Sequence, residues 1–310
     1  MVKESVKDFY KPKPTIPLCS NLGFRSLVKD PKEYYDALGE EEWRRLVRDP
    51  YHKLEFKITM HFLREYLPKA GRILDAGGGP GRYAIELAGL GYEIVLLDFS
   101  PVQLDIAKRK IGRRRKEIRN RIVEMVEGNI IDLSRYDDES FDSVLCLGPL
   151  SHLIEENERR TAAKELVRVL KRNAPIFVSV IGRYGVFRTV LQFLPGELTN
   201  PSHESMFTEG VHHGHEYIHE TRKYHKKKVA FPDAYCFLSE ELPKLFEECG
   251  VRTLRVASCE GLSAHLQRAT NSLYKDRKNW ERWFKIVLET CTDPSILGVG
   301  QHILYVGRKE

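Results

Sequence analysis

The chain has 310 residues, of which 42% are hydrophobic and 30% are charged, so it is a globular protein of one large domain with additions or of two domains. Its formal net charge of +6 permits an anionic partner without requiring one. The longest apolar run, residues 174–181, is far too short to cross a membrane, and the N-terminus has no apolar signal core, so we expect a cytoplasmic protein without a membrane partner.

The cysteines are scattered and form no C-x-x-C pair: Cys19, Cys146, Cys236, Cys249, Cys259 and Cys291. This spacing predicts neither a zinc site nor a disulfide scaffold, and we expect no bound metal. The many charged residues together with only four glutamines are typical of thermophilic proteins.

Residues 1–68 are predicted to form a helical N-terminal extension. Asp30 followed by Pro31 is a helix start, and Tyr34, Leu38, Trp43 and Leu46 then recur at roughly helical spacing. A second helix is expected over residues 51–67.

Residues 69–310 are predicted to form the main domain, because strands and helices alternate from Arg72 onwards. Expected strands are 72–75, 93–98, 122–126, 143–147 and 175–181, with helices at 83–90, 100–115 and 155–170. Such alternation predicts a parallel sheet with right-handed crossovers. An irregular insertion at 183–235 follows, lying over one edge of the sheet. The pattern resumes with a helix at 239–249, a strand at 251–257, a helical segment at about 262–291 and a last strand at 302–306.

A glycine-rich turn joins the first strand to the next helix, with the sequence Asp75-Ala-Gly77-Gly-Gly79-Pro-Gly81. Glycines let the backbone turn tightly and approach a ligand, and free N–H groups at the helix start can hold a polar or anionic group. Asp98 ends the next strand, where a carboxylate can accept hydrogen bonds from two ribose hydroxyls. These features predict a ribose-bearing cofactor at the carboxyl edge of the sheet.

The dinucleotide pattern G-x-G-x-x-G fails from Gly77, because Arg82 takes its third glycine position; it survives only from Gly79, with Ala84 in the last place. Asp75-x-Gly77-x-Gly79-x-Gly81 instead resembles the first motif of class I S-adenosylmethionine (SAM) methyltransferases. Residues 97–100 resemble the second motif of that family, 127–133 the third and 141–150 the fourth, and residues 301–309 look like its final antiparallel strand. The third motif has Asn129 where the family usually has Asp.

The resemblance implies a seven-stranded, mostly parallel sheet with an antiparallel last strand, and SAM as the cofactor with S-adenosylhomocysteine as the product. Carried over residue by residue, it places the cofactor against Asp75, Gly77, Gly79, Gly81, Tyr83, Asp98, Phe99, Ser100, Asn129, Ile130 and Leu147. Asp98 would hold the ribose and Phe99 would pack on the adenine.

The acceptor side of this fold follows the fourth strand. Enzymes that methylate exocyclic base amines often have a polar residue followed by Pro-Pro-aromatic here, whereas this chain has Gly148, Pro149 and Leu150. His152 is the nearest titratable group and is either a proton acceptor or a packing residue. The candidate catalytic residues are Gly148, Pro149, Ser151, His152, Asp233 and Tyr235; the last two either face the site or form a structural turn.

Two basic segments are candidate RNA contacts. Nine of the fourteen residues from Lys108 to Arg121 are Lys or Arg, and a further run follows six clustered histidines in the insertion. The residues are Lys108, Arg109, Lys110, Arg113, Arg114, Arg115, Lys116, Lys226, Lys227 and Lys228. Such runs either track a phosphate backbone or form a solvated surface. The histidines (His203, His212, His213, His215, His219 and His225) fit a polar loop better than a metal site.

The favoured hypothesis is a methyltransferase acting on a base of ribosomal or transfer RNA, with ribosomal RNA preferred as partner and no obligatory protein partner. The sequence looks like archaeal enzymes of this type, including one that methylates the cytidine N4 amine of ribosomal RNA. Two alternatives stay open: a small-molecule methyltransferase in which residues 183–235 form a lid, and a SAM-binding module without turnover.

Overall fold

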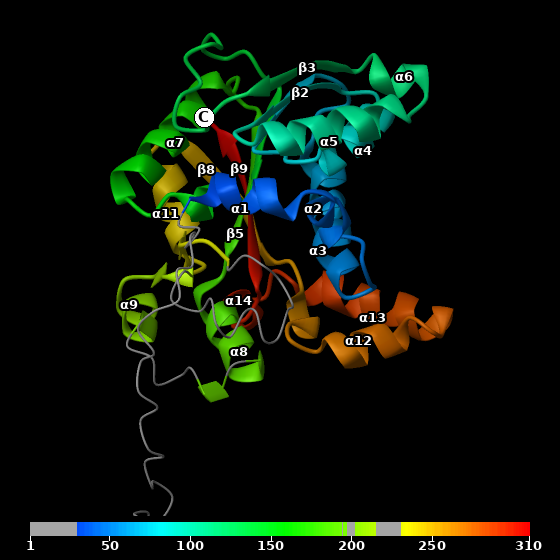
Figure 1. Ribbon diagram of the computed structural model, residues 1–310, viewed down its shortest axis with the longest axis vertical. Coiled ribbons are helices and arrows are strands. Elements are labelled where there is room, and N and C mark those ends of the chain that lie inside the picture. Colours follow the sequence, from blue (N-terminus) through cyan, green and yellow to red (C-terminus); the bar gives the residue numbers. More distant parts are fainter. Residues whose placement is uncertain (1–29, 194, 197–201, 215–230) are drawn as a thin grey trace, which may run out of the picture.

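The computed structural model describes residues 30–193, 195–196, 202–214 and 231–310. Its centre is a seven-stranded sheet with the order β3-β2-β1-β4-β5-β9-β8 (Figure 1). The strands are β1 (Arg72–Ala76), β2 (Glu93–Asp98), β3 (Ile122–Glu127), β4 (Ser143–Leu147), β5 (Pro175–Ile181), β8 (Val251–Ser258) and β9 (His302–Lys309). The pairs among β1 to β5 are parallel, and β9 is antiparallel to both β5 and β8. The predicted fold class is confirmed.

Helices cover both faces of this sheet because side chains alternate between the faces along each strand. Leu74 and Val95 point into one buried cluster, and Ile73 and Ile94 point into the other. The first cluster is closed by α7 (Glu156–Val169) and α11 (Glu241–Glu247). The second is closed by α3 (His52–Tyr66), α4 (Arg82–Gly89), α5 (Pro101–Gly112) and α13 (Arg277–Thr290).

Two predicted helices are shorter than expected. The helix expected over residues 100–115 ends at Gly112, and a separate turn, α6 (Lys116–Arg119), lies at a corner of the molecule (Figure 1). The segment 262–291 divides into η5 (Gly261–Ser263), α12 (Gln267–Leu273) and α13. The division has a local cause, because Asp276 caps α13 by accepting a hydrogen bond from the Asn279 N–H at 3.0 Å.

The N-terminal extension consists of α1 (Pro31–Leu38), α2 (Glu40–Arg45) and α3. The spacing of apolar residues predicted one helix where α1 and α2 stand; Gly39, with φ of 51°, ends α1. Figure 1 shows α1 lying in front of the strands and α2 beside them, near α3 and α4. They are fixed there by the Gln103 side chain, which donates to the Tyr35 carbonyl at 2.6 Å, and by Arg82, which lies 3.9 Å from the Trp43 ring centre.

The insertion after β5 contains α8 (Arg183–Phe193), α9 (Ser202–Thr208) and a two-stranded sheet of β6 (Val211–His212) and β7 (Ala234–Tyr235). The predicted RNA contacts Lys226, Lys227 and Lys228 lie outside the described residues, as do three of the clustered histidines. One short helix, α14 (Pro294–Leu297), precedes β9. Within the described ranges no helix has both the length and the apolar character needed to cross a bilayer.

Candidate active site

A cavity of about 310 Å³ opens at the carboxyl ends of β1, β2 and β4. Parallel strands bring their carboxyl ends to one edge of the sheet, so the loops that follow them converge there. Most of the predicted site residues line this cavity: Asp75, Gly77, Gly79, Tyr83, Asp98, Phe99, Asn129, Ile130, Leu147, Gly148, Pro149 and His152. Gly81, Ser100, Ser151, Asp233 and Tyr235 do not line it.

The glycine turn is required by crowding and by backbone conformation. Gly77 has φ of 76°, and a Cβ atom there would lie 2.0 Å from Cγ of Pro149. Gly81 also has φ of 76° and precedes α4, where an added Cβ would lie 3.2 Å from the Leu96 side chain. The turn therefore brings the backbone against the fourth-strand loop, and a larger residue at 77 would displace Pro149.

Asp98 is held at the floor of the cavity by two backbone donors. Its carboxylate accepts hydrogen bonds from the Gly79 N–H at 2.7 Å and from the Ser100 N–H at 2.9 Å. Burial raises the pKa of this carboxyl to about 6. The Ser100 hydroxyl caps α5 by accepting from the Gln103 N–H at 3.0 Å, so this residue links the helix start to Asp98.

Asp75 carries a buried oxygen without a partner. The residue is 1% exposed, and its Oδ2 has no hydrogen-bond partner among the described residues. Burial, followed by the nearby Asp98 charge, raises the pKa of Asp75 to about 7. An isolated buried carboxylate is costly, and a ligand with hydrogen-bond donors or positive charge would offset that cost. SAM has an ammonium group and ribose hydroxyls, so these two carboxylates fit the cofactor that the sequence predicted.

The candidate catalytic residues after β4 have different surroundings. His152 lies in the cavity wall with Nε2 2.9 Å from the Tyr35 hydroxyl, and burial lowers its pKa to about 4. At neutral pH it is therefore uncharged and a weak proton acceptor. Ser151 accepts a hydrogen bond from the Ile181 N–H at 2.9 Å, which joins the short helix η2 (Pro149–His152) to the end of β5.

Two other candidates belong to the base of the insertion. Tyr235 donates to Glu241 at 3.0 Å, and Arg159 lies 3.6 Å from its ring centre. Asp233 lies 3.6 Å from His213, an ion pair when the histidine is protonated. Neither residue lines the cavity, although the Asp233 backbone contacts His152 in the cavity wall, and their role in the reaction stays a prediction. Tyr235 lies in strand β7 rather than in the structural turn that the sequence also allowed.

The cavity has a roof and a side wall that the motifs did not reveal. These come from the N-terminal helices, from α4 and from the start of β9: Asp30, Pro31, Tyr35, Glu42, Arg45, Leu46, Glu55, Arg82 and His302. A helical extension was predicted, but its spacing of apolar residues did not indicate what it covers.

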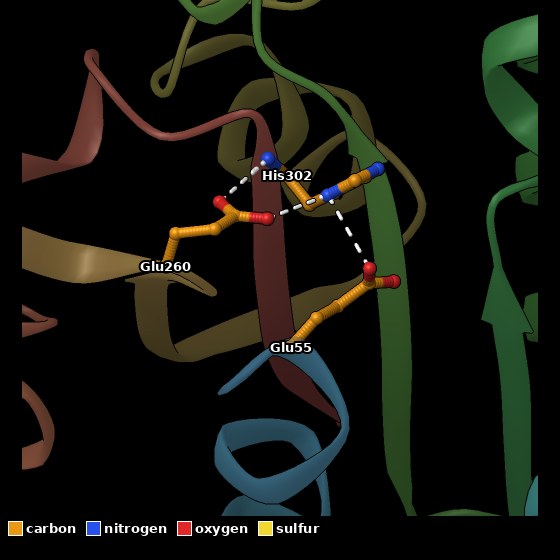
Figure 2. Close-up of side chains that lie close together, drawn as sticks. All are labelled: Glu55, Glu260 and His302. Atoms are coloured by element: carbon orange, nitrogen blue, oxygen red, sulfur yellow. Dashed lines mark hydrogen bonds and ion pairs between the residues drawn. The ribbon is translucent and has the colours of Figure 1, made fainter. Parts of the chain in front are cut away.

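A polar cluster joins this roof to the far edge of the sheet (Figure 2). Nδ1 of His302 lies 2.7 Å from Glu260 and 3.5 Å from Glu55. Burial by itself would lower the pKa of His302, but Glu55 and Glu260 outweigh burial and raise it. The histidine therefore favours its protonated form here.

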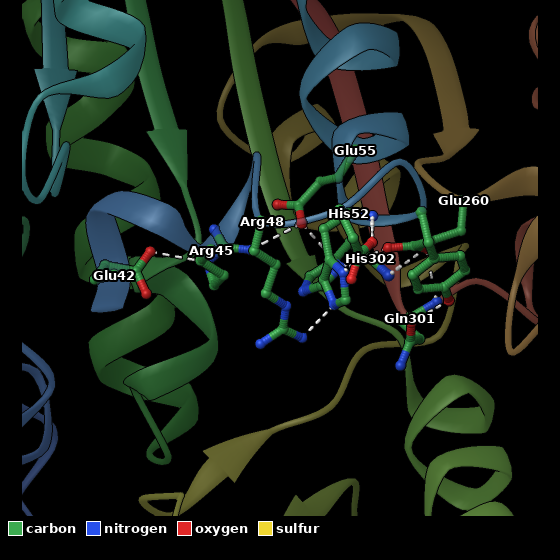
Figure 3. Close-up of polar contacts among 10 residues, drawn as sticks. Glu42, Arg45, Arg48, His52, Glu55, Glu260, Gln301 and His302 are labelled. Carbon is green, nitrogen blue, oxygen red and sulfur yellow. Dashed lines mark hydrogen bonds and ion pairs between the residues drawn. The ribbon is translucent and has the colours of Figure 1, made fainter. Parts of the chain in front are cut away.

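The same three side chains could be considered as metal ligands, since their donor atoms lie within 4.8 Å of one another. The contacts favour another description. The raised pKa of His302 favours the protonated ring, which has no lone pair for a metal, and Arg45 binds Glu55 at 2.8 Å. Figure 3 shows the result, a chain of ion pairs from Glu42 through Arg45 and Glu55 to His302 and Glu260.

The predicted RNA contacts of the first basic run stand apart from the cavity. Arg113, Arg114, Arg115 and Lys116 are exposed and follow the end of α5, which begins beside Asp98 and is roughly 18 Å long. Lys110 and Arg109 pair with Glu40 of α2 at 2.5 and 3.5 Å, so they help to hold the roof. Neither these residues nor Lys108 line the cavity.

Comparison with known proteins supports a methyltransferase domain around this cavity. Residues 74–178 match the family model described as a methyltransferase domain. They form a SAM-dependent methyltransferase domain. SAM is the cofactor of this domain, and the matched range contains the glycine turn, Asp98 and the loop after β4.

Two curated relatives of the methyltransferase domain are similar over part of their length. A glycine/sarcosine N-methyltransferase of Aphanothece halophytica is 29% identical over 153 residues, 47% of this chain and 54% of that protein. A demethylmenaquinone methyltransferase of Clavibacter sepedonicus is 38% identical over 116 residues, 37% of this chain and 43% of that protein. The chain thus spans about half the length of the curated relatives that it matches.

Solved structures extend the likeness in fold to most of this chain. A SAM-dependent methyltransferase of Methanosarcina mazei superposes with a TM-score of 0.54 at 19% identity, covering 80% of this chain and 96% of that one. A protein of Pyrococcus horikoshii superposes with a TM-score of 0.54 at 18% identity, covering 90% of this chain and 99% of that one. At this identity the likeness concerns the fold, which is that of class I methyltransferases.

Proposed function

We propose that this protein transfers the methyl group of SAM to a small molecule held beneath α1 and α2. The observation that carries the proposal is the roofed acceptor side of the cavity. Tyr35 of α1 binds His152 at 2.9 Å, and Arg45 of α2 binds Glu55 of α3 at 2.8 Å, so helices from the extension close over the carboxyl edge of the sheet. A base within an RNA chain could enter only if this roof moved.

The residues of this chain would position the acceptor against the methyl group and exclude water from the site. Positioning dominates the catalysis of methyl transfer. SAM supplies an electrophilic methyl group on a positively charged sulfur. Asp98 would accept from the ribose hydroxyls and Asp75 from the ammonium group, while Phe99 and Ile130 border the base. The weakly basic His152 would orient the acceptor through its contact with Tyr35 rather than remove its proton.

The relatives give further support for a small acceptor. The curated proteins named above are, by their names, methyltransferases of glycine or sarcosine and of demethylmenaquinone. The resemblance to an RNA cytidine N4-methyltransferase receives no support from them.

Methylation of ribosomal RNA is the second candidate, and one observation favours it. Arg113, Arg114, Arg115 and Lys116 are exposed, and such a density of cations can follow a phosphate backbone. If RNA is the substrate, its retention on the protein should fall steeply with salt concentration. A binding module without turnover is the third possibility.

The test uses methyl-labelled SAM with the full-length protein, offered a small-molecule extract and total RNA in parallel. The proposal expects label in the extract and none in RNA. Label in RNA alone would overturn it in favour of the second candidate. Binding of SAM without label in either pool would indicate the binding module. Asp98→Ala serves as the control that should lose transfer in every case.

A further inference from the structure

A second cavity of about 330 Å³ adjoins the cofactor cavity below the roof. The two share six residues: Tyr35, Glu42, Arg45, Glu55, Phe231 and His302. The second cavity is also lined by Tyr34, Leu38, Glu41, Arg48, Tyr51, His52, Glu260 and Gln301. Because it continues from the cofactor site and is made by the extension and by the ends of β8 and β9, it is the place for a methyl acceptor.

The cationic groups of this cavity are already paired. Arg45 donates to Glu42 at 2.8 Å and to Glu55 at 2.8 Å, so both sides of its guanidinium group are taken (Figure 3). The charge of His302 is opposed by Glu260 and Glu55. Arg48 contacts His52 at the rim. A carboxylate ligand would therefore have to displace a carboxylate of the protein.

The balance of charge in the deep part of the cavity is negative. Three carboxylates (Glu42, Glu55 and Glu260) face two cations (Arg45 and His302). At the rim Glu41 and Arg48 cancel, and burial lowers the pKa of His52, which favours its neutral form. Glu55 is 8% exposed and Glu260 only 3%, so water screens the excess charge poorly.

SAM removes only part of this excess. Over both cavities, seven carboxylates (Asp30, Glu41, Glu42, Glu55, Asp75, Asp98 and Glu260) face Arg45, Arg48, Arg82 and His302. A sulfonium, an ammonium and a carboxylate give SAM one net positive charge. Negative charge remains after SAM has bound, even if Asp75 is protonated. A second ligand that binds beside SAM would therefore be stabilised if it carried positive charge.

The second cavity is also lined by aromatic rings. The rings of Tyr34 and Phe231 meet edge to face with centroids 5.5 Å apart, and Tyr35 lies 5.3 Å from Tyr34. Ring faces attract organic cations, and a desolvated ammonium gains most from them. Aromatic rings and a carboxylate excess are independent features, and both favour a cationic organic ligand.

We propose that the methyl acceptor is a small organic amine, whose ammonium group binds in the second cavity between the carboxylates of Glu42, Glu55 and Glu260 and the rings of Tyr34, Tyr35 and Phe231. This inference rests on the proposed function. In the transfer, the deprotonated nitrogen bonds to the methyl carbon while the carbon–sulfur bond breaks and its electron pair stays on sulfur. The proton that the ammonium gives up passes to a cavity carboxylate and then to water.

The experiment is calorimetric titration of the full-length protein, saturated with S-adenosylhomocysteine, with two matched series of probes. One series is 2-phenylethylamine, 2-phenylethanol and 3-phenylpropanoate, and the other is propylamine, 1-propanol and butanoate. The proposal expects an amine to bind at least about tenfold more tightly than its matched alcohol and carboxylate. Equal or tighter binding of a carboxylate, or no binding of either amine, would overturn it.

Variants locate the binding site and separate the two proposals. Glu55→Gln should weaken amine binding by about tenfold, and the partly exposed Glu42→Gln by about threefold, which keeps a test available if the buried variant does not fold. Glu33→Gln, exposed on α1 and outside both cavities, is the matched control and should bind as the parent does. Unchanged amine affinity in both cavity variants contradicts the proposal. If the parent protein does not bind S-adenosylhomocysteine at all, the proposed function is contradicted instead.

Discussion

The cofactor cavity and the second cavity adjoin each other but are built in different ways. The first is made by loops that directly follow β1, β2 and β4, within the matched residues 74–178. The second brings residues 34–55 against Glu260, Gln301 and His302, more than 200 positions away. A consecutive strand–turn–helix unit can be identified from its sequence alone, whereas a wall assembled from both ends of the chain cannot. The cofactor is therefore much easier to predict than the acceptor.

The strongest test of the first cavity is Asp98→Ala. Removing this carboxylate takes away the acceptor proposed for the ribose hydroxyls, and we expect SAM affinity to fall by at least about 100-fold. Calorimetry measures the affinity, and thermal melting shows whether the protein stays folded. Asp105→Ala, an exposed position on α5, is the control and should bind normally. Unchanged affinity in Asp98→Ala would break the assignment of the cavity.

The second test concerns stability and pH within the same cavity. Asp75→Asn removes a buried carboxyl of which one oxygen, Oδ2, has no described partner, so we expect the ligand-free variant to gain on the order of 1–3 kcal/mol at pH 8. In the parent, the folded pKa of about 7 lies above the unfolded value of about 3.9, so the folded state loses stability as pH rises between them.

Denaturant unfolding at several pH values checks this expectation. The advantage of Asp75→Asn should be largest above pH 7 and should shrink as pH falls towards 5, while SAM binding by the variant should weaken at all pH values. A variant less stable than the parent at pH 8 would show that Asp75 has a partner that its surroundings do not reveal.

The second cavity is tested by Arg45→Met. This change leaves Glu42 and Glu55 without their shared cation, and Glu55 is buried, so we expect a loss of about 1–3 kcal/mol in the free energy of unfolding. Arg44→Met, an exposed position on the same helix, should change stability by less than about 0.5 kcal/mol. Urea unfolding compares the two. Equal effects would mean that the ion-pair chain does not hold α2 in place.

The smallest effect is expected outside both cavities. Changing Arg113, Arg114 and Arg115 together to Glu should leave methyl transfer to a small acceptor within about twofold of the parent, since these exposed residues line neither cavity. A labelled-SAM assay with small-molecule extract measures this. If the parent methylates RNA and the same variant largely loses this activity, RNA would become the favoured substrate.

The amino-acid sequence by itself determined the strands, the fold class and most of the cofactor cavity. Strand boundaries such as Glu93–Asp98 follow from short apolar runs, and the glycine turn and Asp98 occupy fixed places in one strand–helix–strand unit. Their contacts, such as the Gly79 N–H to Asp98 at 2.7 Å, join residues only 19 positions apart. Local geometry fixes such contacts before the rest of the chain is considered.

Only the tertiary structure decided which side chains face the acceptor. His152 was the obvious proton acceptor from its place after β4, but packing under Tyr35 removes it from water and lowers its pKa to about 4. His302 stood in the sequence as an ordinary strand residue, yet it meets Glu55 and Glu260 because β9 inserts antiparallel beside β5. The charge and basicity of these groups depend on burial and on partners far away in the chain, and such long-range contacts leave no local pattern in the sequence.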